Sequence, residues 1–148
     1  MFDDPYGPEI LNPFLDFQLL NSCLHCMDRG DKLTGKAATL IVMKILMQEA
    51  GLNYCCDSPQ RVLSVVQVLR QPVERLSGCP CLQLLKYVVQ CYLCLTRKYM
   101  LAGVYDALRH NFPPQLSDNT FHISLHQDPK IPNMLQQICS NMWRGYRP

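Results

Sequence analysis

The sequence predicts an all-α protein, and three observations lead to this prediction. Apolar residues recur at spacings of three and four along most of the 148 residues, which is the period of a helix with one buried face. Glycine and proline fall between these stretches, where helices end or begin. The composition, 48% hydrophobic and 18% charged, is typical of a globular chain and excludes global disorder.

The first two helices are expected over residues 14–29 and 34–50. The first follows Pro13 and precedes Gly30, a residue suited to the left-handed position after a helix end. The second is apolar on most of its circumference, so we expect neighbours on several of its sides, and we expect Gly51 to end it. The buried stripe of the first helix comprises Leu20, Cys23, Leu24 and Met27.

A connection over residues 53–56 leads to the third helix, which Asp57 is placed to cap and Pro59 to begin. We expect Pro72 to interrupt this helix, because proline lacks a backbone donor and disfavours helical geometry in the preceding residue. The buried stripe of this helix comprises Val62, Val65, Val66 and Leu69.

The second half of the chain repeats the pattern of helices and short connections. We expect a helix with a wide apolar face over residues 81–97, a shorter one over 99–110, one or two turns over 119–127, and a last helix from Asp128 to just before Gly145. Such short connections predict a layered helical stack rather than a four-helix bundle. The stripe of the last helix comprises Ile131, Met134, Leu135, Ile138, Cys139 and Met142.

Charge and composition exclude several classes of protein. The net charge of +2 is too weak to act by itself as an electrostatic footprint for nucleic acid. The longest charge-free stretches, residues 17–27 and 87–96, are shorter than the roughly 18 to 20 apolar residues of a membrane span. The acidic, proline-broken start is unlike a secretory signal, so we expect a cytosolic or nuclear chain whose nine cysteines are free thiols.

Three residue pairs have spacings that can hold a metal ion. They are Cys23 with Cys26, Cys91 with Cys94, and His122 with His126. The cysteine pairs lie in apolar helical stretches, where a free thiol behaves as a small hydrophobe, and no third ligand stands near the histidines. We therefore expect no metal and no cofactor. A catalytic cysteine with a histidine base stays open, but the sequence contains no phosphate-binding glycine loop or serine-hydrolase turn, so we expect no enzyme.

Five stretches of the chain carry a resemblance to a known family. They are residues 19–30, 33–46, 51–56, 84–95 and 107–121. In this order and spacing they resemble the "required for cell differentiation" family, over about residues 8–143. That family supplies the armadillo-repeat subunit of the CCR–NOT mRNA deadenylase complex.

The resemblance implies an armadillo-like α-solenoid cut to about three repeats. Only the C-terminal half of the family domain is matched, with residues 1–13 as an extension, 14–144 as the helical domain and 145–148 as a tail. The face of the first helix that would meet a preceding repeat, through Phe14, Leu15 or Phe17, is then expected to be exposed and to favour self-association into a homo-oligomer.

The function implied by the resemblance is that of a non-catalytic adaptor in mRNA decay and in post-transcriptional and transcriptional regulation. Such an adaptor acts in the cytoplasm and nucleus, away from membranes. Its partners are the NOT scaffold subunit and tryptophan-containing or short helical peptides of decay regulators. Two alternatives stay open: a transcriptional cofactor that binds nucleic acid weakly, and a divergent paralogue that keeps the fold but has lost the partner surfaces.

The helical stretch from Leu84 to Leu95 is the expected wall of a peptide-binding groove. Three cations near and after its end are open to two interpretations, a small basic patch or an ordinary solvated helix end. The family tends to have basic residues where Gln90 and Cys94 stand, so phosphate-dependent binding should be weakened here. Residues 96–106 form a longer connection than the family's and lack its proline, so the local surface is expected to differ. The expected groove residues are Lys86, Tyr87, Gln90, Tyr92 and Cys94, and those of the patch are Arg97, Lys98 and Arg109.

Overall fold

The computed structural model describes residues 13–78, 81–116 and 127–145, and its secondary structure within these ranges is entirely helical, which confirms the all-α prediction. None of the helices in these ranges is long and apolar enough to cross a membrane. In chain order the elements are α1 (Pro13–Arg29), α2 (Lys32–Met47), α3 (Glu49–Cys56), α4 (Pro59–Gly78), α5 (Leu82–Thr96), α6 (Ala102–Asn111), the 3-10 turn η2 (Pro114–Leu116) and α8 (Lys130–Gly145).

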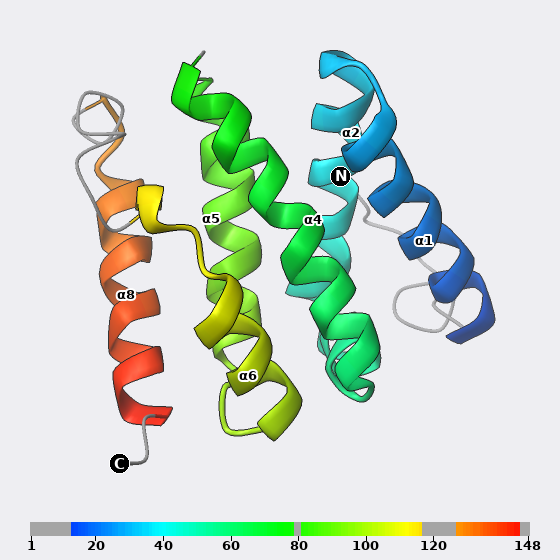
Figure 1. The fold of residues 1–148 in the computed structure, drawn as a ribbon, viewed down its shortest axis with the longest axis vertical. Coiled ribbons are helices and arrows are strands. Elements are labelled where there is room, and N and C mark those ends of the chain that lie inside the picture. The colour runs from blue at the N-terminus through cyan, green and yellow to red at the C-terminus, as the bar shows by residue number, and fades with distance from the viewer. Residues whose placement is uncertain (1–12, 79–80, 117–126, 146–148) are drawn as a thin grey trace, which may run out of the picture.

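The helices form two packed layers. In one layer α2 packs against α5 and α5 packs against α8, and in the other α1 packs against α4 and α4 packs against α6. Figure 1 shows α4 and α6 in front of α5, with α1 and α8 at opposite ends of the stack. The inner helices α4 and α5 thus have neighbours in both layers, which is the arrangement of an armadillo-like helical stack.

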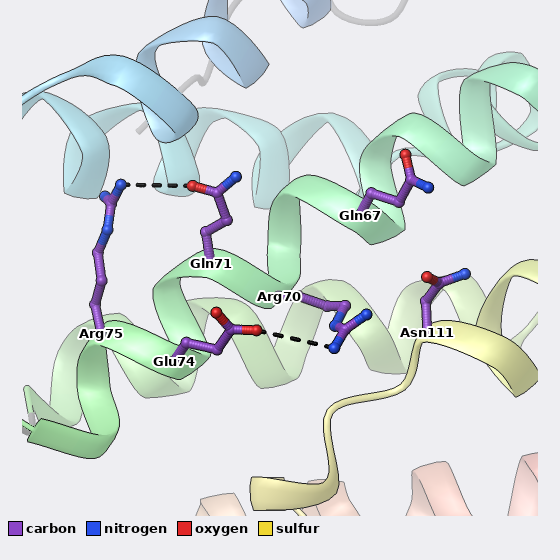
Figure 2. Close-up of a pocket in the computed structure, with 6 residues that line it drawn as sticks. All are labelled: Gln67, Arg70, Gln71, Glu74, Arg75 and Asn111. Atoms are coloured by element: carbon purple, nitrogen blue, oxygen red, sulfur yellow. Dashed lines mark hydrogen bonds and ion pairs between the residues drawn. The ribbon is translucent and has the colours of Figure 1, made fainter.

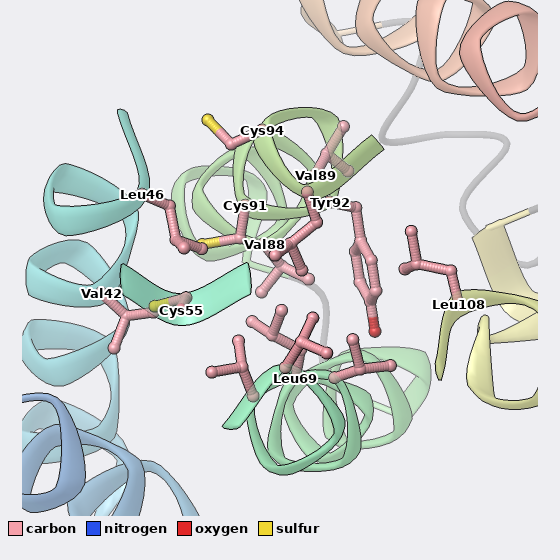
Figure 3. Packing of buried hydrophobic residues seen from close by; sticks show 14 of the residues in the cluster. Val42, Leu46, Cys55, Leu69, Val88, Val89, Cys91, Tyr92, Cys94 and Leu108 are labelled. Carbon is pink, nitrogen blue, oxygen red and sulfur yellow. The ribbon is translucent and has the colours of Figure 1, made fainter. Parts of the chain in front are cut away.

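The hydrophobic core lies between the two layers, and inward-facing side chains of α4 and α5 dominate it (Figure 3). The stripes predicted for the first and third helices are confirmed, because the most exposed of their side chains is Leu24 at 7%. The stripe predicted for the last helix is too wide. Ile131 and Ile138 are fully buried there, whereas Cys139 is exposed.

Helix α4 continues through Pro72, so the predicted interruption is wrong. The ring of Pro72 is buried, and the flanking side chains attach this part of α4 to α1. The Gln71 amide donates a hydrogen bond to the Asp28 carboxylate, and the Arg75 guanidinium donates to the backbone oxygen of Asp28 at 3.2 Å. These tertiary contacts offset the backbone hydrogen bond that proline removes.

The second predicted helix is in fact two helices, because the chain turns at Gln48. Gln48 has extended backbone angles, φ −93° and ψ 138°, and α3 begins directly after it. Gly51 does not end a helix. It lies inside α3, so close to α2 that a Cβ atom there would overlap the backbone oxygen of Ile45. The predicted connection over residues 53–56 is helical because Leu52 and Cys55 are buried in the core.

Some helix ends and exposures also differ from prediction. Helix α2 begins at Lys32, where the Asp31 carboxylate accepts a hydrogen bond of 2.8 Å from the Thr34 backbone N–H. One side of α2 is open to solvent, including Leu33, which is 78% exposed, so this helix is less enclosed than expected. Of the turns expected over residues 119–127, residues 119–126, with His122 and His126, lie outside the described part, as do the side chains of Phe14, Leu15 and Phe17.

Candidate functional site

Three of the predicted groove residues, Lys86, Tyr87 and Gln90, lie half-buried on α5. The Lys86 ammonium forms an ion pair with the Asp128 carboxylate, with a distance of 3.3 Å between Nζ and Oδ2. Asp128 precedes α8, and its carboxylate also accepts a 2.9 Å hydrogen bond from the Lys130 backbone N–H, which is the main cause of its lowered pKa. Lys86 thus links α5 to the start of α8.

The structure corrects the prediction for Tyr92 and Cys94, because both are fully buried. Tyr92 lies on the opposite side of α5 from Gln90, since two residues correspond to about 200° of helical rotation. Its ring packs edge-on against Phe112 with 5.2 Å between centroids, and its phenol points between α4 and α6 (Figure 3). Cys94 shares the face of Gln90, whose amide contacts the Cys94 sulfur at 3.6 Å. Neither residue can line an exposed groove.

The three cations of the predicted basic patch lie after α5 and on α6. Lys98 pairs with Glu49 at 3.2 Å between Nζ and Oε1, and Arg109 donates a 2.6 Å hydrogen bond to the Tyr105 hydroxyl. Arg97 is exposed. Because the Lys98 ammonium is paired with a carboxylate, this surface offers less free positive charge than the sequence suggests, whereas Arg109, whose partner is a neutral hydroxyl, keeps its full charge.

The thiols considered as metal ligands or nucleophiles belong mainly to the core. Cys91 and Cys94 are 0% exposed and Cys23 is 5% exposed. Burial raises the pKa of the Cys91 thiol well above its ordinary value, because the low-polarity interior disfavours the thiolate. The described residues contain no group of three histidine, cysteine, aspartate or glutamate side chains placed to hold a metal ion.

Thiol labelling at about pH 8 should therefore separate the cysteines by burial, because the thiolate is the reactive form. Among the cysteines that the structure describes, we expect Cys139, which is exposed, to react fastest in the folded protein. Cys55 and Cys91 should react only on unfolding, and Cys56 should be slow because burial raises the pKa of its thiol to about 11. Mass spectrometry of the labelled peptides measures each site. Fast labelling of Cys91 in the folded protein would contradict the packing described above.

A pocket that the sequence did not predict lies where α1 ends, α2 begins, α4 ends and α5 begins. It has a volume of about 330 Å³, within the usual range of ligand pockets. Most of its lining is apolar. The apolar side chains are Met27, Leu33, Pro72, Leu76, Cys81 and Leu84.

Positive charge predominates among the polar residues of this apolar pocket. Lys32, Lys36 and Arg75 contribute cations, against the single carboxylate of Asp31. The Asp31 carboxylate is held by the Thr34 backbone N–H, which lowers its pKa. Arg75 is fixed by hydrogen bonds to backbone oxygens at the end of α1. An apolar pocket with a basic border suits an apolar anchor that is flanked by acidic residues.

One signal for this pocket was present in the sequence. Leu33 and Pro72 are apolar residues outside the regular buried stripes, and both line the pocket. The spacing of apolar residues along the sequence could not predict that Leu33 and Pro72 would line the same pocket. Their proximity depends on α4, which continues through Pro72 toward the start of α2.

Comparison of the sequence with known proteins identifies the family of this chain. A sequence model of the Rcd1-like cell differentiation family matches residues 3–142. Cell differentiation protein rcd1 of Schizosaccharomyces pombe is 34% identical over 136 residues, which are 92% of this chain and 47% of that protein. Protein CAF40 of Saccharomyces cerevisiae is 30% identical over 131 residues, which are 88% of this chain and 34% of that protein. The chain thus spans less than half the length of these relatives, and it belongs to the Rcd1-like cell differentiation family.

Proposed function

We propose that this chain is a non-catalytic adaptor subunit of the CCR–NOT mRNA deadenylase complex, acting in mRNA decay and gene regulation in the cytoplasm and nucleus. The observation that carries the proposal is the family match over residues 3–142, because the resemblance implies an armadillo-type subunit of that complex. The two-layered helical stack supports it, since stacks of this kind present long surfaces to extended or helical peptides.

The two cysteines of the Cys91 and Cys94 pair are not available as nucleophiles. A nucleophilic cysteine needs a thiolate that its substrate can reach. Cys91 is fully buried and has a raised pKa, and Cys94 is also fully buried. Neither thiol is placed for nucleophilic attack.

The apolar pocket is the proposed anchor site for a short helical or tryptophan-containing peptide and for the NOT scaffold subunit. Leu33 lies near the start of α2 with 78% of its surface exposed, so its apolar side chain is accessible to a partner. Lys36 and Arg75 border the same pocket and favour acidic residues beside the anchor. In this proposal, a buried apolar side chain of the partner supplies most of the affinity, and neighbouring charges add to it. Most protein interfaces likewise depend on a few buried side chains for most of their affinity.

A pull-down with the NOT scaffold segment tests the proposal. The double variant Leu33→Ala/Lys36→Glu removes an apolar contact and reverses a charge at the pocket, and we expect it to bind at least about tenfold more weakly. Leu33 is so exposed that its replacement should leave the fold intact, which circular dichroism can verify.

The matched control also shortens one exposed apolar side chain and reverses one positive charge, but at the end of α5 that lies away from the pocket. Met100 is 64% exposed and Arg97 is exposed, so Met100→Ala/Arg97→Glu should fold and bind as the unaltered chain does. Equal loss in both double variants would place the partner elsewhere. No binding of the folded, unaltered chain at micromolar concentration would favour the divergent paralogue instead.

A further inference from the structure

The apolar pocket carries positive charge that the described residues do not neutralise. Lys36 lies half-buried at its border and forms no ion pair within the described part of the chain. Arg75 donates hydrogen bonds to the backbone oxygens of Met27 and Asp28. It also contacts the amide oxygen of Gln71 at 3.5 Å (Figure 2). These acceptors are neutral, so both cations keep their charge for the carboxylates of a bound segment.

The carboxylates beside this pocket already have partners. Asp31 lines the pocket, and its carboxylate accepts a 2.8 Å hydrogen bond from the Thr34 backbone N–H. The Asp28 carboxylate lies 3.4 Å from the Arg29 guanidinium and also accepts from the Gln71 amide. The apolar lining and the cations at its border therefore fit an occupant that brings both an apolar side chain and negative charge.

The first residues of this chain, which lie outside the described part, have that composition. Phe2 is followed directly by Asp3 and Asp4. Residues 1–12 also contain Glu9, and they include no lysine or arginine. Aromatic side chains are enriched at the buried centres of protein interfaces, and carboxylates complement a basic border. The chain thus contains its own segment with the properties that the pocket favours.

This segment is long enough to reach the pocket of the same chain. Helix α1 begins at Pro13, and Met27, which lines the pocket, follows 14 residues later. At about 1.5 Å per residue, the helix covers roughly 21 Å between them. Phe2 precedes Pro13 by 11 residues, which can span up to about 36 Å at roughly 3.3 Å per residue. A second copy of the chain is therefore not needed to bring Phe2 to the pocket.

We propose that residues 2–4 dock into the apolar pocket of their own chain, with the Phe2 ring against the apolar lining and the two carboxylates directed to Lys36 and Arg75. This inference rests on the proposed function in one respect, because the docked segment competes with the partner for the same site. A segment joined over this length has an effective concentration on the order of 1 mM, so a contact with a dissociation constant near 1 mM fills about half of the pockets. The partner then binds about twofold more weakly than it binds an open pocket.

The docking is tested in the full chain alone, through the nuclear magnetic resonance signals of its nitrogen-labelled backbone amides. Phe2→Ala removes the ring current at the pocket, so we expect shifts at residues 33–36 and at Leu84 but none at residues 97–101. Tyr6→Ala is the matched control, because it removes the other aromatic ring of the segment, and it should leave these signals unchanged. Circular dichroism verifies that both variants fold.

The charge pairing is tested on α2. Lys36→Glu should release the segment and reproduce, at Leu84 on α5, the shift seen with Phe2→Ala. Lys44 is exposed on the same helix but does not line the pocket, so Lys44→Glu should not shift Leu84. The docking is overturned if Phe2→Ala leaves the pocket signals unchanged or if Tyr6→Ala shifts them equally. It is also overturned if the effect of Phe2→Ala disappears on dilution, which would assign the segment to a second copy.

The competition is measured separately, by calorimetric titration with the NOT scaffold segment. We expect Phe2→Ala to bind this partner about twofold more tightly than the unaltered chain does. Equal or weaker binding by Phe2→Ala, in a chain whose pocket signals do shift, overturns the competition. If neither chain binds the partner, the proposed function fails, and with it the competition, whereas the pocket signals still decide the docking.

Discussion

Replacing Tyr92 with alanine should lower the free energy of unfolding by about 3–5 kcal/mol, the usual cost of removing a buried aromatic ring. Tyr92 is fully buried and packs edge-on against Phe112. Since domains are stable by only about 5–15 kcal/mol, this change removes a large part of the total. Urea denaturation followed by circular dichroism measures the effect.

The matched control is Tyr92→Phe, which keeps the ring and removes a hydroxyl that has no partner among the described residues. We expect its stability to remain within about 1 kcal/mol of the unaltered chain. The comparison also decides the role of Tyr92. A groove residue would tolerate alanine and lose only partner binding, so a Tyr92→Ala variant with the unfolding free energy of the unaltered chain would contradict its place in the core.

The second large effect is expected at Gly51. A Cβ atom there would overlap the backbone oxygen of Ile45, and a backbone atom cannot move aside as a flexible side chain can. We therefore expect Gly51→Ala to lower the free energy of unfolding by about 3 kcal/mol, by displacing α3 from α2. Thermal and urea unfolding provide the measurement.

Gly35→Ala serves as the control with the opposite sign. Gly35 lies inside α2, and the nearest atom to an added Cβ, the Cys26 backbone oxygen, is 3.8 Å away, an ordinary contact. Alanine restricts the unfolded chain more than glycine, so this variant should be more stable by about 0.5–1 kcal/mol. Similar stabilities for the two variants would mean that α2 and α3 are not packed as described.

The periodicity of apolar residues predicted most of the helices because burial of one face decides where a helix packs. Val62, Val65 and Leu69 repeat at helical spacing, and all are 0% exposed. The errors occurred where tertiary contacts override local preference. Pro72 remains inside α4 because its neighbours attach to α1, and Gly51 serves a close helix contact rather than a helix end.

The candidate site was less predictable than the fold. Lys86, Tyr87 and Gln90 lie half-buried on α5, and their place in a peptide-binding groove stays a prediction, whereas Tyr92 was assigned to that groove because aromatic residues often act as anchors. Its position on the opposite side of the helix follows from the 3.6-residue period alone. The apolar pocket joins Leu33 to Leu84, which are far apart in sequence, and only the packing of α2 against α5 brings these regions together.

Hydrogen–deuterium exchange of the chain, alone and with the NOT scaffold segment, tests the adaptor assignment most directly. Amide exchange slows where a partner covers and stabilises the backbone. We predict slower exchange in the complex at residues 31–39, 73–76 and 81–84, the stretches that contain most of the residues lining the apolar pocket. A folded chain whose exchange does not change at micromolar partner concentration, or slows only in the turn over residues 97–101, would contradict this account.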